Sequence, residues 1–322
     1  MPLAVKSLIL VAVCLVAFWG WTQQRARTHE ARAEASFPPE GQIIDVSGHR
    51  VHAVVMGNGP DLVLIHGASG NTRDLTFELA PRLAERYRVI VIDRPGLGYT
   101  ARINRTGATI TQQAALLQEA AAQLGADKPI VLGHSYGGAV ALAWAVTRPD
   151  HIAALVDVAG AAKPWDTGLS TYYRVLSHPV LGPLVIPLLT AFVHDTRVEQ
   201  AVREIFTPQE PPEGYLEHIG AGLTLRRHSL RANALQRANL LAEIEALHTL
   251  YGTITVPVEI VHGTADTTVG VSIHSEPLAA QIPGAHLAVL DGVGHMPHHS
   301  DPEAVIAAID RAATRAGLHP VD

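Results

Sequence analysis

The chain has 322 residues, of which 48% are hydrophobic and 17% charged, which is enough apolar material for one large core plus an insertion or a small second domain. Its net charge of −6 at pH 7 offers no basic surface of the size that nucleic-acid binding requires. The single cysteine excludes intrachain disulfides and cysteine-based metal sites.

Residues 1–34 form a separate N-terminal segment. Residues 7–24 carry no charge, and the run 8–21 is almost wholly apolar. As a helix, that run spans about 21 Å, short of a hydrocarbon core of about 30 Å unless flanking residues contribute. We predict an uncleaved membrane anchor with Trp19 and Trp21 at an interface. A cleaved signal peptide, and hence a secreted protein, is the alternative. The side of the membrane stays open, the periplasm being one option.

The folded part is predicted to start after Pro38 and Pro39, so removal of residues 1–34 is expected to leave it intact. Short apolar runs predict strands at 42–46, 50–56, 61–65, 88–92, 129–132, 152–158, 258–262 and 286–290. Longer periodic segments predict helices at 75–86, 109–124, 139–147 and 302–316. Because helices alternate with strands that are mostly apolar throughout, we expect an α/β fold with a mostly parallel sheet covered on both faces.

Residues 163–253 break this alternation. Their pattern predicts no strand and indicates several helices separated by prolines. Since strands of the main sheet are predicted on both sides, the segment is an insertion that divides the core into residues 35–162 and 254–322. We expect the charged stretch around Arg226, Arg227 and Arg231 to be a solvated helix face, orientation of an acidic substrate being the alternative.

Ser135 stands at the centre of a G-x-S-x-G pattern, residues 133–137, between an apolar strand and an alanine-rich helix. In such an elbow the serine takes a strained backbone conformation, and the glycines let strand and helix approach. The hydroxyl is then held at a helix N-terminus, where amide groups favour developing negative charge. We predict that Ser135 is a nucleophile.

A serine nucleophile on this scaffold needs an acid and then a histidine later in the chain. Asp266 and His295 each follow a predicted strand, so all three side chains are expected at the carboxyl edge of the sheet. Asp157 is the alternative acid, although its place inside a strand favours a packing role. His298 and His299 are alternative bases or parts of a metal site, but no carboxylate or cysteine accompanies them at ligand spacing.

The backbone amides of Tyr136 and Ala68 are the expected oxyanion donors. Tyr136 directly follows the nucleophile, and Ala68 lies in the His66–Gly70 loop after an earlier strand. We expect His298 at a pocket rim, His299 in solvent, and structural roles for His66 and His134.

The segments 66–67, 93–98, 133–138, 262–266 and 294–295, in this order, resemble the α/β-hydrolase fold superfamily over about residues 40–320. The resemblance implies an eight-stranded sheet, a helical cap inserted after the sixth strand, and no metal or organic cofactor. It also implies that the 93–98 loop buttresses the site. Haloalkane dehalogenases and epoxide hydrolases of this superfamily carry an aspartate nucleophile, whereas this chain has Ser135.

The sequence therefore predicts a serine hydrolase that cleaves a carboxylic ester or related acyl compound. Alternatives are a cofactor-free haloperoxidase or carbon–carbon bond hydrolase with the same triad, and a binding protein without turnover. The apolar stretches of the insertion indicate a small, moderately hydrophobic substrate.

Overall fold

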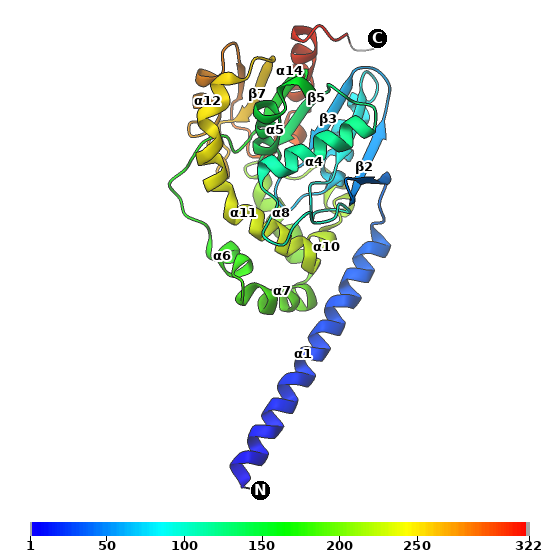
Figure 1. Ribbon diagram of the computed structural model, residues 1–322, viewed down its shortest axis with the longest axis vertical. Coiled ribbons are helices and arrows are strands. Elements are labelled where there is room, and N and C mark those ends of the chain that lie inside the picture. The colour runs from blue at the N-terminus through cyan, green and yellow to red at the C-terminus, as the bar shows by residue number, and fades with distance from the viewer. Residues whose placement is uncertain (1, 320–322) are drawn as a thin grey trace.

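The computed structural model describes residues 2–319. Eight strands form one sheet in the order β1-β2-β4-β3-β5-β6-β7-β8, and Figure 1 shows helices on either side of it. Their bounds are β1 Gln42–Val46, β2 His49–Met56, β3 Asp61–Ile65, β4 Arg88–Ile92, β5 Ile130–His134, β6 Ala154–Val158, β7 Val258–Gly263 and β8 His286–Leu290. The pairs β1–β2 and β2–β4 are antiparallel and the other five pairs are parallel, so the expected mostly parallel sheet is confirmed.

Helices cover both faces of this sheet. On one face lie α4 Ile110–Gln123, α5 Tyr136–Thr147 and α12 Ser275–Gln281. On the other lie α2 Thr72–Thr76, α3 Leu79–Leu83 and α14 Pro302–Arg315. The central strands β3, β5 and β6 are buried on both faces, which is why they read as continuous apolar runs.

Local signals set the helix boundaries. Thr109 and Gln112 form a capping box at the start of α4, and the Asp301 side chain accepts a hydrogen bond from the Ala304 amide ahead of α14. The helix predicted over 75–86 is instead two five-residue helices, α2 and α3. The Asn71 side chain caps α2 and starts it three residues earlier than predicted.

The insertion between β6 and β7 is helical, as predicted. It contains α6 Thr171–Ser177, α7 Leu181–Phe192, α8 Asp195–Phe206, α9 Tyr215–His218, α10 Ala221–Thr224, α11 Arg227–Leu247 and the 3₁₀ segment His248–Thr253. It rests on loops that follow strands: Asn233 of α11 bonds Ser69 after β3, and Gln209 bonds Gly294 after β8. The insertion therefore lies over the carboxyl edge of the sheet.

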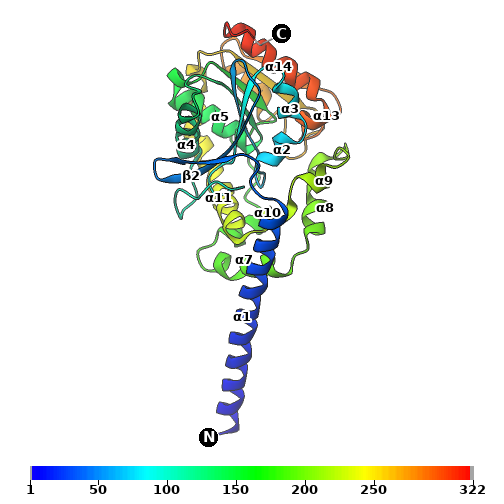
Figure 2. The same cartoon turned by 90° about the vertical axis from the view of Figure 1, so that its right-hand side faces the viewer.

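The N-terminal segment is a single helix, α1 Leu3–Ser36, which projects from the body beside the insertion (Figures 1 and 2). Its first half is exposed, whereas Thr22, Ala26 and Ala33 in the second half are buried. Among residues 2–319, α1 is the one helix long and apolar enough by itself to cross a membrane, a property that signal sequences share.

Two ion pairs tie α1 to the insertion. Arg227 pairs with Glu30 at 2.6 Å, and Arg226, only 2% exposed, pairs with Glu34 at 3.0 Å. The prediction of a solvated arginine face is therefore wrong, because Arg226 is buried and both arginines are paired. The sequence could not indicate this, since the acidic partners lie almost two hundred residues away. Removal of residues 1–34 would therefore leave Arg226 and Arg227 without these carboxylate partners.

Candidate active site

Ser135 joins β5 to α5 in a strained conformation, with φ of +55° and ψ of −116°. This left-handed φ is costly for a residue with a side chain, and such strain persists where surrounding structure enforces it. Here the Ser135 amide donates to Val158 O at 3.0 Å, and the helix follows at once. The predicted elbow is thus present in the backbone.

Glycines on either side make this geometry possible. A Cβ on Gly133 would lie 2.1 Å from Gly137 O, and a Cβ on Gly137 would lie 2.2 Å from Ile65 O. Both distances are far below van der Waals contact with backbone that cannot move aside. The spacing of the motif therefore reflects the close approach of α5 to β5 and β3.

The structure brings Ser135, His295 and Asp266 together. His295 Nε2 lies 2.9 Å from Ser135 Oγ, and His295 Nδ1 lies 2.6 Å from Asp266 Oδ2. All three side chains are buried. Asp266 follows β7 and His295 follows β8, so parallel strands deliver them to one edge, as predicted. This arrangement can move a proton from a serine hydroxyl to an imidazole oriented by a carboxylate.

Asp266 is held in place and kept ionised. Its Oδ1 accepts from the amides of Thr268 and Val269 at 2.8 and 2.9 Å, and its Oδ2 also lies 3.1 Å from His262 Nε2. Burial raises the pKa of Asp266, but hydrogen bonds from His262, His295 and Val269 outweigh that effect, so the pKa falls below its ordinary value. His262, four residues before Asp266, is a contributor that the sequence reasoning missed.

The alternative acid, Asp157, lies inside β6 and is fully buried. Its Oδ1 would be 2.3 Å from a Cβ on Gly138 and 1.9 Å from one on Gly160, so it packs against the backbone around the elbow. Burial raises the pKa of Asp157 to about 7. Because His295 Nδ1 pairs with Asp266 and not with Asp157, the geometry favours Asp266.

The loop after β3 lies against Ser135. A Cβ on Gly67 would stand 3.3 Å from Ser135 Cβ, and Ala68 is the next residue. The buried Arg94 side chain fixes this loop through bonds to His66 O at 3.0 Å and Gly67 O at 2.9 Å. Its guanidinium also lies 4.2 Å from the Tyr136 ring centroid. One side chain thus links both segments that carry the expected oxyanion amides.

The loop that follows β4 is organised by Asp93. Its carboxylate accepts from the amides of Thr72 at 2.7 Å and Tyr99 at 2.8 Å and contacts His52 Nδ1 at 2.6 Å. His66 Nε2 accepts from the Arg94 amide at 3.0 Å, and burial lowers the pKa of His66 to about 4. Both residues support the loops around the site, as expected from the sequence.

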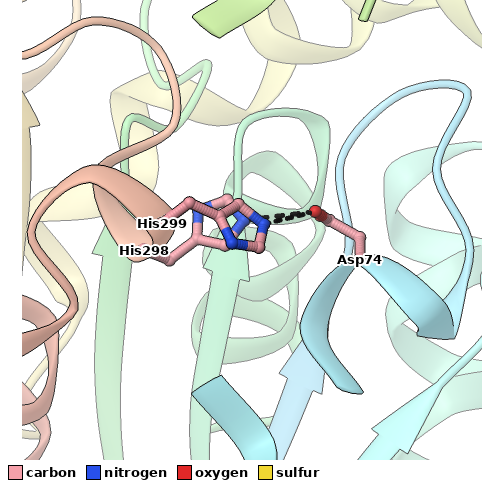
Figure 3. A group of neighbouring side chains, drawn as sticks. All are labelled: Asp74, His298 and His299. Carbon is pink, nitrogen blue, oxygen red and sulfur yellow. Dashed lines mark hydrogen bonds and ion pairs between the residues drawn. The ribbon is translucent and has the colours of Figure 1, made fainter. Parts of the chain in front are cut away.

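A second buried cluster joins Asp74 of α2 to His298 and His299 of α13 Pro297–Ser300 (Figure 3). Asp74 Oδ1 lies 2.9 Å from His299 Nε2 and 3.4 Å from His298 Nε2, and it accepts from the Tyr215 hydroxyl at 2.7 Å. One carboxylate and two imidazoles at this spacing could hold a metal ion. The same contacts are also explained without a metal ion, as hydrogen bonds in which both Nε2–H groups donate to Asp74.

Electrostatics favour the hydrogen-bonded form of this cluster. Burial raises the pKa of Asp74, but His298 and His299 outweigh it and hold that pKa well below its ordinary value. Burial lowers the pKa of His298 to about 4, which leaves the ring neutral. Metal-bound imidazoles almost always donate their second nitrogen to a partner, yet the Nδ1 atoms of His298 and His299 have none among the described residues.

His134 lies between this cluster and the backbone of His295. The His134 and His298 ring centroids are 4.3 Å apart, and His134 Nε2 lies 2.9 Å from His295 O. Burial holds the pKa of His134 well below its ordinary value, so a neutral ring donates Nε2–H to that carbonyl. The structural role expected for His134 is borne out by this contact. The prediction that His299 lies in solvent is wrong, because α13 turns it inward toward Asp74.

Known proteins and one protein family are similar to this chain. The model of a family described as "Alpha/beta hydrolase family" matches residues 62–308. Haloalkane dehalogenase 2 of Mycobacterium tuberculosis is 25% identical over 286 residues, covering 85% of this chain and 94% of that protein. A pimeloyl-[acyl-carrier protein] methyl ester esterase of Vibrio vulnificus is 26% identical over 257 residues, covering 79% and 94%.

The fold is shared with solved structures. A thermophilic esterase from Thermogutta terrifontis superposes with a TM-score of 0.68 and 21% identity, covering 86% of this chain and 99% of that one. At this identity the likeness concerns the fold alone.

Proposed function

Since this chain belongs to the alpha/beta hydrolase family, we propose that it is a serine hydrolase of carboxylic esters or related acyl compounds. The observation that carries the proposal is the chain of contacts from Ser135 Oγ through His295 to Asp266, at 2.9 and 2.6 Å. A strained serine at a helix N-terminus with a buried base and acid is suited to acyl transfer.

The proposed reaction has two halves. Ser135 Oγ attacks the ester carbonyl carbon while its proton passes to His295 Nε2, and Asp266 stabilises the imidazolium. The amides of Tyr136 and Ala68 receive the oxyanion. Collapse of the tetrahedral intermediate breaks the bond to the alcohol, which takes the proton from His295. Water, deprotonated by His295, then cleaves the acyl-enzyme and restores Ser135.

The nucleophile separates this proposal from the dehalogenase relative. Resemblance to haloalkane dehalogenases implies an aspartate at the elbow, whereas here the position holds Ser135. A carboxylate can displace a halide from carbon, but a serine activated by a neutral imidazole is suited to a carbonyl centre. The esterase relative supports the ester class.

We also propose that residues 1–34 form an uncleaved anchor, that residues 163–253 form a cap, and that 35–162 and 254–322 form the catalytic core. Loss of α1 by signal cleavage after residue 35 would remove Glu30 and Glu34. The buried Arg226 guanidinium would then lose its carboxylate partner, which is costly. Retention of α1 is therefore favoured.

A serine-directed fluorophosphonate tests the assignment of the nucleophile. Wild-type protein and the control Ser47→Ala, at an exposed serine, should be labelled and should release 4-nitrophenolate from a short-chain ester. Ser135→Ala should not be labelled and should lose at least about a thousandfold in kcat. Labelling without turnover of any ester would indicate a binding protein or one of the other triad chemistries, and substantial Ser135→Ala activity would overturn the proposal.

A further inference from the structure

The insertion carries an exposed apolar face on α7. Four of its side chains are between 37% and 61% exposed, and they are Val180, Leu181, Leu184 and Phe192, here called the α7 face. The helix itself, Leu181–Phe192, has no charged residue. Large apolar side chains exposed together on one uncharged helix indicate a contact with another molecule or with lipid.

The α7 face adjoins the end of the apolar half of α1. The Phe18 and Phe192 rings stack with centroids 6.2 Å apart and an interplanar angle of 3°, and Trp21 meets Phe192 at 5.2 Å. Arg25 lies 5.4 Å from the Trp21 ring centroid and donates to Ala191 O at 3.2 Å. Aromatic rings followed by an arginine are typical of a membrane–water boundary.

The lengths of α1 and α7 indicate where the membrane–water boundary would lie on the protein. From Leu3 to Trp21, α1 extends about 28 Å, close to the hydrocarbon thickness of a bilayer. If α1 spans the membrane, Trp21 and Phe192 lie at its surface. By contrast, α7 extends only about 18 Å and meets α6 at a bend of 111°. It is therefore too short to cross and is suited to lie along the surface.

The link between α1 and the insertion fixes α7 at that level. The ion pairs Arg227–Glu30 and Arg226–Glu34 join the polar half of α1 to the start of α11, and α7 packs along α1. Figures 1 and 2 both show α7 beside α1, at the end of the body farthest from α14. The anchor thus cannot enter a bilayer without bringing the α7 face against it.

We propose that α7 is a second membrane contact, an interfacial helix whose exposed side chains enter the same phospholipid bilayer that α1 spans. The inference rests on α1 as an anchor and does not depend on the proposed ester chemistry. In this arrangement the insertion faces the lipid and the sheet lies farther from it. Substrates that partition into the bilayer surface would therefore meet the insertion first.

The test uses full-length protein in phosphatidylcholine vesicles. Cys14→Ser removes the native thiol, and single cysteines then carry an environment-sensitive bimane label. Leu184→Cys reports on α7, Val11→Cys on α1, and Thr314→Cys, exposed on α14 at the opposite end, is the matched control. Lipids brominated in the acyl chain quench labels that enter the bilayer, and aqueous iodide quenches labels in water.

We expect brominated lipid to quench positions 11 and 184 at least about twofold more than 314, since an interfacial helix is buried about 5–10 Å into the lipid boundary. Quenching at 11 with none at 184 would overturn the proposal while leaving the anchor. Absence of lipid quenching at both positions would remove its premise and overturn it too. Protection of 184 from lipid and iodide alike would show that protein, such as a second copy, covers the α7 face.

Discussion

The Asp266→Asn variant tests the proposed triad most directly, because the structure dictates how the new amide must lie. In the native chain, Asp266 Oδ1 accepts from two backbone amides at 2.8 and 2.9 Å. An asparagine must keep its carbonyl oxygen there, since its NH₂ group would otherwise face two backbone donors that cannot change. The NH₂ group therefore takes the position of Oδ2, 2.6 Å from His295 Nδ1.

That orientation of the amide reverses the tautomer of the His295 imidazole. An NH₂ group only donates at this position, so His295 Nδ1 must become the acceptor and its proton moves to Nε2. Nε2–H then faces Ser135 Oγ and cannot take its proton. The corresponding change in a serine protease lowers kcat by about 10⁴, and we expect a loss of that order here.

Stopped-flow or steady-state release of 4-nitrophenolate measures kcat, and the fluorophosphonate labelling rate reports the same nucleophile without turnover. Asp157→Asn is the matched control, an identical change at a buried carboxylate in β6 that should keep kcat within about tenfold of wild type. The reasoning fails if Asp266→Asn retains more than about a tenth of wild-type kcat, or if Asp157→Asn is the more damaging change.

Three further predictions concern the stability of the fold. Gly137→Ala should destabilise the protein by about 3 kcal/mol in chemical unfolding, because its Cβ would stand 2.2 Å from a backbone oxygen, whereas Gly168→Ala, with nothing within 4 Å, should not. Glu34→Gln should cost about 1 kcal/mol and lower the melting temperature, because Arg226 is buried but its partner Glu34 is 48% exposed, so solvent screens the pair; an unchanged melting temperature would contradict that pairing. The raised pKa of Asp157, about 7, means that the unfolded chain ionises first, so wild type should lose up to about 4 kcal/mol relative to Asp157→Asn as pH rises from about 4 to about 7. Parallel pH–stability curves for the two proteins would refute this burial argument.

Much of the sheet could be predicted from the sequence because its signals are local. A fully buried parallel strand needs an unbroken apolar run, so β3, β4 and β5 are recognisable without knowledge of their neighbours. The elbow at Ser135 is equally local, since its glycines act on residues a few positions away. The order of Ser135, Asp266 and His295 after successive strands then indicates one shared edge.

Contacts between distant segments could not be predicted in this way. Nothing near Arg226 indicates that its carboxylate partner lies in the N-terminal helix, and a run of arginines alone is typical of a solvated face. His299 resembles a loop residue until α13 turns it toward Asp74 and Tyr215, which come from two other parts of the chain.

The sequence by itself therefore determined the elements of the sheet and the candidate nucleophile, acid and base, because each depends on spacing within one short segment. Only the tertiary structure decided that α1 binds the insertion, that Asp74 contacts two histidines, and that the end of α7 packs against Trp21. Burial converts a charge from a solvated group into one that needs a specific partner. Which residue supplies that partner depends on how the helices pack, and spacing along the chain does not encode it.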